Sequence, residues 1–200
     1  GEEAKRQVSE QGQNVAALIN ARTEDIYFTA AAASQTTGIK GNAEGYESKG
    51  KHIITSRIEH HAILHTCAYL EQKGYEVTYL DVDEDGKISL EELEKAIRPD
   101  TILISIMQQT MRSEQSSQSK RSVRSHMTTA YYSTQMRTGI WNIPIDVEEM
   151  NIDMLSASGH KINGPKGIGV MYIRKGVKIR SFIHGGAQER KRRAGTHNVP

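Results

Sequence analysis

Residues 101–107 form a run, Thr-Ile-Leu-Ile-Ser-Ile-Met, in which almost every side chain is apolar. A strand with one solvated face would alternate apolar and polar residues, so this run is typical of a strand buried on both faces of a parallel sheet. Such a strand needs a layer of helices on each side. We therefore predict an α/β domain of three layers, with a mostly parallel sheet flanked by helices.

The rest of the chain supplies the elements that such a fold needs. Apolar residues at helical spacing predict helices, and short β-branched runs predict strands. The expected helices cover residues 2–20, 62–73, 90–97 and, as a short acidic turn of helix, 147–150. The expected strands cover residues 26–29, 52–55, 76–80 and 152–157, and residues 169–183 are expected to form a hairpin.

Composition indicates one globular domain without strong preference for nucleic acid or membrane. The 200 residues carry a net charge of +2, and no apolar run reaches membrane-spanning length. The single cysteine, Cys67, excludes an internal disulfide and lies on the apolar stripe of an expected helix. With no signal-like segment at Gly1, we expect a cytoplasmic protein in which Cys67 is structural.

Lys161 lies in a tight, glycine-bounded turn directly after an expected strand, in the stretch Ser-Gly-His-Lys-Ile-Asn-Gly-Pro-Lys-Gly of residues 158–167. The α/β folds bind ligands at the carboxyl ends of their strands, where Ser158 and His160 would offer phosphate-binding groups. An amine that is partly desolvated and crowded by a second cation loses its proton readily, as a Schiff-base lysine must. This layout is typical of a lysine that binds pyridoxal 5'-phosphate (PLP), although an ordinary solvated turn lysine is the simpler interpretation of any single lysine.

The Ser-Gly-His-Lys motif, with the Gly-Pro-Lys-Gly that follows it, resembles the cofactor-lysine motif of the cysteine desulfurases, the NifS-like branch of the class V aminotransferases. Several further segments resemble the same family in the same order along the chain. They are residues 52–56, 59–62, 101–107, 143–146, 184–190 and 193–196.

The resemblance implies a fold type I homodimer that uses PLP to take sulfur from L-cysteine, leaving alanine and a protein persulfide. Lys161 would then bind the cofactor covalently, and His60 would stack on its pyridine ring as the second catalytic residue. Ser158 and His160 would bind the cofactor phosphate, and Thr196 would reach the phosphate of the partner subunit. Sulfur-acceptor proteins and a role in iron–sulfur cluster biogenesis follow from the family, no metal ligands are expected, and the selenocysteine lyases stay open as an alternative.

Two windows, residues 30–38 and 108–141, depart from the family and lack three of its motifs. Intact relatives have Ser-Gly-Gly/Ala-Thr/Ser-Glu after the first strand, Asn-Asn-Glu-x-Gly after the buried strand, and then His-x-Asp-Ala-x-Gln. Counting back from Asp146 places Ser133 at that histidine, Gln135 at the aspartate and Thr138 at the glutamine. The aspartate pairs with the pyridinium nitrogen, and a neutral amide cannot replace its charge. The simplest interpretation of the longer window is a disordered, mildly basic loop.

A shifted reading frame accounts for both windows. Residues 109–114 can be encoded CAA ACA ATG AGA TCG GAA, and the same bases read two positions later give Asn-Asn-Glu-Ile-Gly. Residues 131–137 likewise yield Leu-Phe-His-Thr-Asp-Ala, and residues 30–37 yield Gly-Gly-Ser-Glu, all with the same offset. We therefore expect residues 1–200 to be a partial PLP-binding large domain with two frameshifted windows. The family's small domain, substrate-binding arginine and persulfide cysteine are expected to be absent, and the chain to be inactive.

Other functions compete with this interpretation. Residues 81–92 match the EF-hand calcium-loop pattern, but the β-formers before them predict an entering strand, whereas an EF-hand needs an entering helix. The alternative is a strand-to-helix turn with Asp and Ser near the helix start. Nucleic-acid binding by Lys120, Arg121 and Arg124, or by residues 190–193, lacks interleaved aromatic residues. A non-catalytic remnant also remains possible.

Overall fold

The computed structural model describes residues 2–29, 33–107, 128–133, 145–159 and 166–180. The helices are α1 (Glu2–Leu18), α2 (Ala33–Tyr46), α3 (His61–Gln72) and α4 (Leu90–Ala96), with a 3₁₀ turn at Thr23–Asp25. The strands are β1 (Ile26–Thr29), β2 (His52–Ser56), β3 (Glu76–Leu80), β4 (Thr101–Ile106), β5 (Thr128–Ser133), β6 (Met154–Ser158) and β7 (Gly169–Ile173). No helix in this described part of the chain is both long and apolar enough to cross a bilayer.

The strands form one seven-stranded sheet in the order β1-β7-β6-β5-β4-β2-β3. The neighbouring pairs from β6 to β3 are all parallel, and β7 runs antiparallel to both of its neighbours, β6 and β1. Strand β1 therefore points the same way as the parallel strands. The prediction of a mostly parallel α/β sheet is confirmed.

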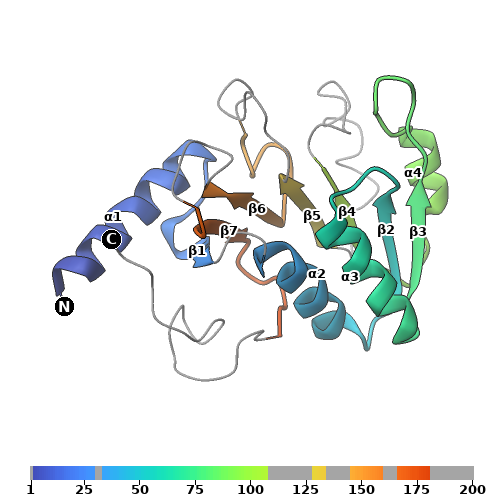
Figure 1. Ribbon diagram of the computed structural model, residues 1–200, viewed down its shortest axis with the longest axis horizontal. Coiled ribbons are helices and arrows are strands. Elements are labelled where there is room, and N and C mark those ends of the chain that lie inside the picture. Colours follow the sequence, from blue (N-terminus) through green and yellow to red (C-terminus); the bar gives the residue numbers. More distant parts are fainter. Residues whose placement is uncertain (1, 30–32, 108–127, 134–144, 160–165, 181–200) are drawn as a thin grey trace.

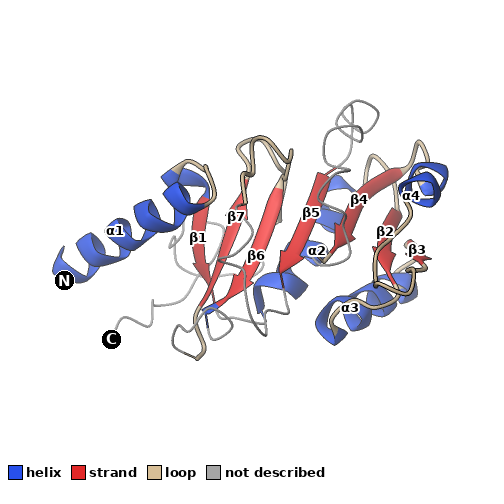
Figure 2. Cartoon of the chain, turned by 90° about the horizontal axis from the view of Figure 1, so that it is seen from above, coloured by secondary structure: helices blue, strands red, loops and turns tan. Residues whose placement is uncertain are grey.

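Helices cover both faces of this sheet, as Figures 1 and 2 show. Ile53 packs in a cluster with side chains of α2 and α3, whereas Ile54, the next residue, packs on the opposite face with side chains of α4. Ala16 of α1 packs with Ile26 of β1 on the same face as α4. The three predicted layers are thus α2 and α3, the sheet, and α1 with α4.

Strand β4 has all six of its residues buried. Leu103 lies beside Ile53 and belongs to the cluster on the α2–α3 face, while Ile104 lies beside Ile54 and belongs to the α4 face. The apolar run therefore serves two cores at once, as its lack of alternation predicted.

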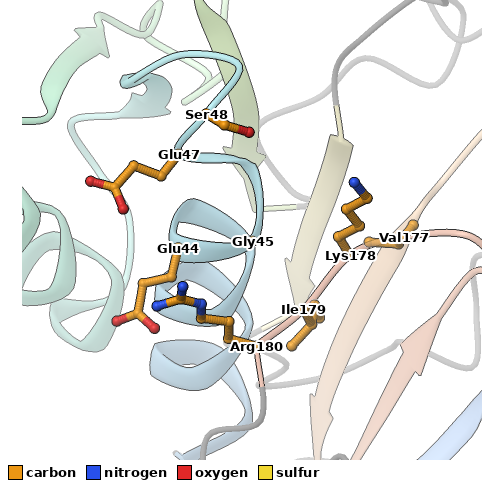
Figure 3. Close-up of a pocket in the computed structure, with 8 residues that line it drawn as sticks. All are labelled: Glu44, Gly45, Glu47, Ser48, Val177, Lys178, Ile179 and Arg180. Carbon is orange, nitrogen blue, oxygen red and sulfur yellow. The ribbon is translucent and has the colours of Figure 1, made fainter.

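Helix α2 lets the segment 177–180 pass close to its backbone because glycines lie at the contact. A Cβ on Gly41 would come within 2.8 Å of Ile179 Cγ2, and a Cβ on Gly45 within 2.8 Å of the Lys178 carbonyl oxygen. The backbone N–H of Arg180 donates to the Gly41 carbonyl oxygen at 3.0 Å. A polar groove of about 660 Å³ runs along this contact near the carboxyl end of α2, and Figure 3 shows Arg180 reaching toward the side of Glu44.

Four elements differ from the sequence-based expectations. Residues 33–46 form α2, where no helix was expected, and residues 128–133 form β5 inside the longer window, where no strand was expected. Strand β7 pairs with β6 and β1 rather than returning in a hairpin, because β1 fills the place beside it. Residues 147–150 form a turn, which Asp146 stabilises by accepting the backbone N–H groups of Glu148 and Glu149 at 2.9 and 2.7 Å.

His52 connects three adjacent strands through its ring. It is fully buried on β2, with Nδ1 2.7 Å from Thr101 Oγ1 of β4 and Nε2 2.8 Å from Thr78 Oγ1 of β3. Burial, and then the nearby Arg98, lower the pKa of His52. The neutral ring therefore satisfies one hydroxyl on each side within the sheet.

Replacing His52 by Ala should destabilise the protein by about 2–4 kcal/mol, because a cavity forms and the hydroxyls of Thr78 and Thr101 lose the imidazole as a partner, although Thr101 keeps the backbone N–H of Arg98. Urea unfolding followed by circular dichroism measures this loss. His65→Ala, on an exposed position of α3, is the matched control and should change the free energy of unfolding by less than about 0.5 kcal/mol. Equal effects of the two substitutions would contradict the role of the buried ring.

Candidate functional site

The parallel strands bring several polar residues to one edge of the sheet, where their carboxyl ends meet. Ser158, the last residue of β6, lies beside Gly169 of β7, and Gly169 lies beside Thr29, the last residue of β1. Strands β5, β4 and β2 end at the same edge with Ser133, Ile106 and Ser56. Ligands of open α/β sheets bind at this edge, so it is the candidate site.

His60 lies at this edge because the chain turns from β2 into α3. It is the N-cap of α3, and its Nδ1 accepts the backbone N–H of Ala62 at 3.1 Å. A neutral ring that accepts at Nδ1 carries its proton on Nε2, which fixes both the tautomer and the orientation of the imidazole. The side chain is half-buried. The ring is therefore held by the helix start and is not a freely rotating surface group.

Glu59, the residue before His60, is a buried carboxylate that links two strand ends. Its Oε1 accepts the backbone N–H of Met107, just beyond β4, at 2.6 Å and the hydroxyl of Ser56, at the end of β2, at 3.4 Å. The residue is 5% exposed, and its second oxygen, Oε2, is buried and has no hydrogen-bond partner among the residues that the structure describes. A buried oxygen left in this state costs free energy.

Burial raises the pKa of Glu59 to about 7. The backbone N–H groups of Met107 and His60 and the hydroxyl of Ser56 act in the opposite direction, because they stabilise the charged form. Desolvation is the larger effect. The side chain thus changes its charge near neutral pH, which is unusual for a carboxyl group and typical of functional sites.

The structure describes two of the five predicted site residues. Ser158 is buried at the end of β6 and His60 caps α3, both at the carboxyl edge, and their roles toward a cofactor stay predictions. The backbone N–H of Gly159 donates to the Ile168 carbonyl oxygen at 2.7 Å and so closes the base of the loop that carries the lysine. Lys161, His160 and Thr196 lie outside the described residues.

The described residues fit an elongated, partly anionic ligand such as PLP. Strands β6 and β2 are separated by β5 and β4, so Ser158 and the turn that carries His60 belong to strands about 14 Å apart at ordinary strand spacing. Side chains that extend inward from strands this far apart can contact the phosphate and the pyridine ring of one PLP molecule. The distance is too wide for both residues to bind one small ion. The buried Oγ1 of Thr29 and Oε2 of Glu59 lack partners among described residues, leaving polar atoms at this edge to be satisfied.

A groove of about 380 Å³ opens beside this edge, between the first turns of α2 and α3. Lys40 and the histidines His61 and His65 line it, and the Lys40 ammonium lies 4.5 Å from the centre of the Tyr69 ring. No carboxylate is among the lining residues, which are Thr36, Lys40, His61, Ala62, His65, Thr66 and Tyr69. The described lining of this groove therefore carries one lysine and two histidines.

The EF-hand-like segment forms a strand-to-helix turn. Strand β3 enters it, as predicted, and Asp83 Oδ1 accepts the backbone N–H groups of Asp85 and Lys87 at 3.0 and 2.8 Å. Ser89 caps α4 by accepting the backbone N–H of Glu92 at 3.4 Å. Within the described ranges no group of three or more His, Cys, Asp and Glu side chains could hold a metal ion. This geometry favours the turn over the calcium site.

Cys67 lies on the buried face of α3, in the hydrophobic core, as predicted for a structural thiol. Burial is the largest cause that raises its pKa, to about 12, and the nearby Glu59 and Glu71 add to it. The thiol therefore stays protonated and cannot act as a nucleophile at neutral pH.

The sequence analysis gave no role to Glu59 or Thr29. Glu59 belongs to a quoted motif, but a carboxylate in a short loop reads as a solvated residue unless its contact with Met107, 48 positions away, is known. Thr29 ends a short strand, which signals the sheet edge without indicating its buried hydroxyl. Local sequence carries no signal for either long-range environment.

Comparisons with known proteins show the family to which the chain is similar. The sequence matches the family model "Aminotransferase class-V" over residues 1–200. It is 50% identical over 203 positions to "Cysteine desulfurase IscS" of Methanosarcina thermophila, covering all of this chain and 50% of that protein. It is 43% identical over 202 positions to "Cysteine desulfurase IscS" of Dictyoglomus turgidum, covering all of this chain and 51% of that protein. The chain spans about half the length of these curated relatives.

Solved structures give the same result. A "NifS-like protein" superposes with a TM-score of 0.91 at 38% identity, with 99% of this chain and 56% of the other covered. The structure "SspA in complex with cysteine" superposes with a TM-score of 0.86 at 35% identity, with 98% and 58% covered. The structural similarity to both proteins therefore extends over the whole described sheet.

Glu59 should make stability depend on pH in a defined window. Its pKa is about 7 when folded and 4.5 when unperturbed, so the unfolded chain releases the proton first as pH rises. The free energy of unfolding should therefore fall from about pH 4.5 to about pH 7, by about 3 kcal/mol at most, and then level off. Urea unfolding across this range measures it against Glu59→Gln, which cannot titrate.

The matched control is Glu71→Gln, on an exposed position of α3. The free energy of unfolding of the unaltered protein, relative to that of Glu59→Gln, should decline from about pH 4.5 to about pH 7. Relative to that of Glu71→Gln, it should not show this decline. A flat Glu59→Gln difference would show that the carboxyl group titrates at an ordinary pKa.

Proposed function

Because this chain belongs to the class V aminotransferase family, we propose that it is the PLP-binding part of a cysteine desulfurase, which transfers sulfur from L-cysteine to a protein and leaves alanine. The observation that carries this proposal is the carboxyl edge of the sheet, which holds the fixed ring of His60 and the buried hydroxyl of Ser158. The names of the relatives support the substrate, since two are cysteine desulfurases and one solved structure is titled as a complex with cysteine.

Each proposed residue has a distinct task. PLP, when bound, serves as an electron sink that weakens bonds at the amino acid's α-carbon and β-carbon. Lys161 would attach it, Ser158 and His160 would hold its phosphate, and Thr196 would reach the phosphate site of a partner subunit. His60 presents a ring whose Nε2–H points away from α3, because Nδ1 is occupied by the helix cap. That ring can pack on an aromatic ligand and keep water from one of its faces.

The two unusual windows are proposed to be frameshifted family sequence rather than insertions. The alignment with the Methanosarcina relative covers 203 positions and the whole of this chain. The windows therefore replace family residues at about the same length and are not long insertions. Strand β5 lies in the middle of the sheet inside the longer window and ends at Ser133, two residues before Gln135. This supports placing Gln135 where the family has its aspartate, and so supports weak cofactor binding and a non-catalytic remnant as the alternative function.

The remaining assignments follow from the family. A homodimer would bring Thr196 to the site of the other subunit. Sulfur-acceptor proteins would receive the persulfide, with iron–sulfur cluster biogenesis as the expected pathway and the cytoplasm as the expected compartment. A selenocysteine lyase would present the same edge, and the substrate assay would separate the two activities.

Mixing the protein with PLP should give at most a weak visible absorption band, because Gln135 cannot supply a charged partner. Gln135→Asp should strengthen PLP binding about tenfold, since a charge-assisted hydrogen bond contributes about 1.5–3 kcal/mol. Absorbance titration measures the affinity, and Lys161→Ala should abolish the band. Gln118→Asp, in the same window, is the control for added charge. A strong band in the unaltered protein that is lost in Lys161→Ala would support PLP binding by Lys161. It would contradict the prediction that this binding is weak.

The coding DNA should contain compensating small insertions or deletions that bound the two windows, near the codons of Thr29 and Met107 at their starts. Restoring the shifted frame should give back Ser-Glu, Asn-Asn-Glu-Ile-Gly and His-Thr-Asp-Ala motifs at the counted positions. Resequencing the gene with its flanks measures this directly. Codons that cannot yield these motifs in any frame would refute the frameshift.

A further inference from the structure

We infer that Glu59 is a positioning residue that fixes the imidazole of His60 over the ligand site by joining the loop after β2 to the end of β4. That the His60 ring contacts a cofactor rests on the proposed function. That Glu59 holds the ring in place does not. Glu59 itself touches no ligand in this role. It acts through the backbone of its neighbour.

The link starts from the geometry of two adjacent parallel strands. Strands β2 and β4 are hydrogen-bonded neighbours that end at the same edge, and beyond β4 the backbone N–H of Met107 has left the ladder. Glu59 Oε1 accepts that N–H at 2.6 Å, while Ser56 donates to the same oxygen from the end of β2. One carboxylate oxygen therefore ties the β2–α3 loop to β4.

The tie reaches His60 because the His60 backbone N–H also stabilises the charged Glu59 carboxyl group. His60 follows Glu59 directly and has extended dihedral angles, φ −60° and ψ 144°, before α3 begins. Its ring is fixed on the other side by the 3.1 Å hydrogen bond from the Ala62 N–H. The imidazole is thus held between a loop attached to β4 and the first turn of α3. Loss of the first attachment should loosen the second.

The role needs a hydrogen-bond acceptor of the right length and does not need a charge. Oε1 accepts the hydrogen bonds from Met107 and Ser56, whereas Oε2 is buried and has no partner within the described part of the chain. Glutamine keeps an acceptor oxygen at the same distance from the backbone, so Glu59→Gln should preserve the tie. Aspartate is shorter by one methylene and keeps the charge, so Glu59→Asp should lose the contact with Met107. The two substitutions separate reach from charge.

Amide hydrogen exchange and the ¹⁵N signals of the His60 ring test the inference without any cofactor. Glu59→Ala and Glu59→Asp should accelerate exchange at Met107 and Ala62 by at least about tenfold, the effect expected from one lost hydrogen bond. The His60 ring should change from the single Nε2–H tautomer to a mixture. Glu59→Gln should resemble the unaltered protein in all three signals. Glu71→Ala, from the exposed side of α3, is the control for a lost carboxylate.

A purely structural role gives a different result. In that case Glu59→Asp and Glu59→Ala would accelerate exchange equally at Met107, Ala62 and a core amide such as Leu103, and the His60 ring would keep one tautomer. Unchanged exchange at Ala62 with an unchanged ring would also overturn the inference. If Glu59→Ala does not fold, the comparison of Glu59→Gln with Glu59→Asp decides in its place.

PLP titration of the same variants separates this inference from the proposed function. If the unaltered protein binds PLP, Glu59→Asp should weaken binding about tenfold and Glu59→Gln should not. If the unaltered protein binds no PLP, the proposed function is contradicted. The hydrogen exchange and the ¹⁵N signals of the His60 ring still decide the role of Glu59.

Discussion

Burial of β4 on both faces is the constraint on which the rest of the structure depends. Because Leu103 and Ile104 enter different cores, helices must lie on both sides, and connections between parallel strands must cross over the sheet. The crossovers through α2, α3 and α4 in turn bring the carboxyl ends of the strands to one edge. The position of the candidate site is therefore a consequence of how the core is buried.

At that edge the backbone groups that leave the ladder need new partners, and Glu59 supplies one. Removing a carboxylate from water is unfavourable, and the pKa of about 7 shows that three donors do not fully compensate the burial. An apolar core residue would avoid this cost but could not accept the Met107 N–H. A destabilising side chain kept beside a fixed imidazole is typical of a site where geometry matters more than stability.

Sequence predicted those elements whose own side chains determine their environment. Strand β4 and helix α3 show apolar patterns that match the faces they bury, so their place in the fold was correct to within a residue. Strand β5 was missed because its position comes from backbone hydrogen bonds to β4 and β6 rather than from an apolar run of its own. Helix α2 was missed for a similar reason. Gly41 and Gly45 weaken the local helix signal, and the contact with residues 178–180 requires glycine at both positions. Of the proposed site residues, Ser158 was predicted from its place after an expected strand and His60 from a family motif, whereas Glu59 needed a contact that no local pattern contains.

This difference explains how a family fold and an altered chemistry can occur in one chain. A strand in the middle of a sheet is stabilised by backbone hydrogen bonds that every residue except proline can make, so β5 can form from Thr-Thr-Ala-Tyr-Tyr-Ser. Cofactor chemistry instead depends on a particular charge at a particular atom, and an amide at position 135 cannot supply it. The frameshift that we propose for this window would therefore remove function before it removes topology. The edge built by Glu59, His60 and Ser158 lies outside the windows, and for that reason it keeps its geometry.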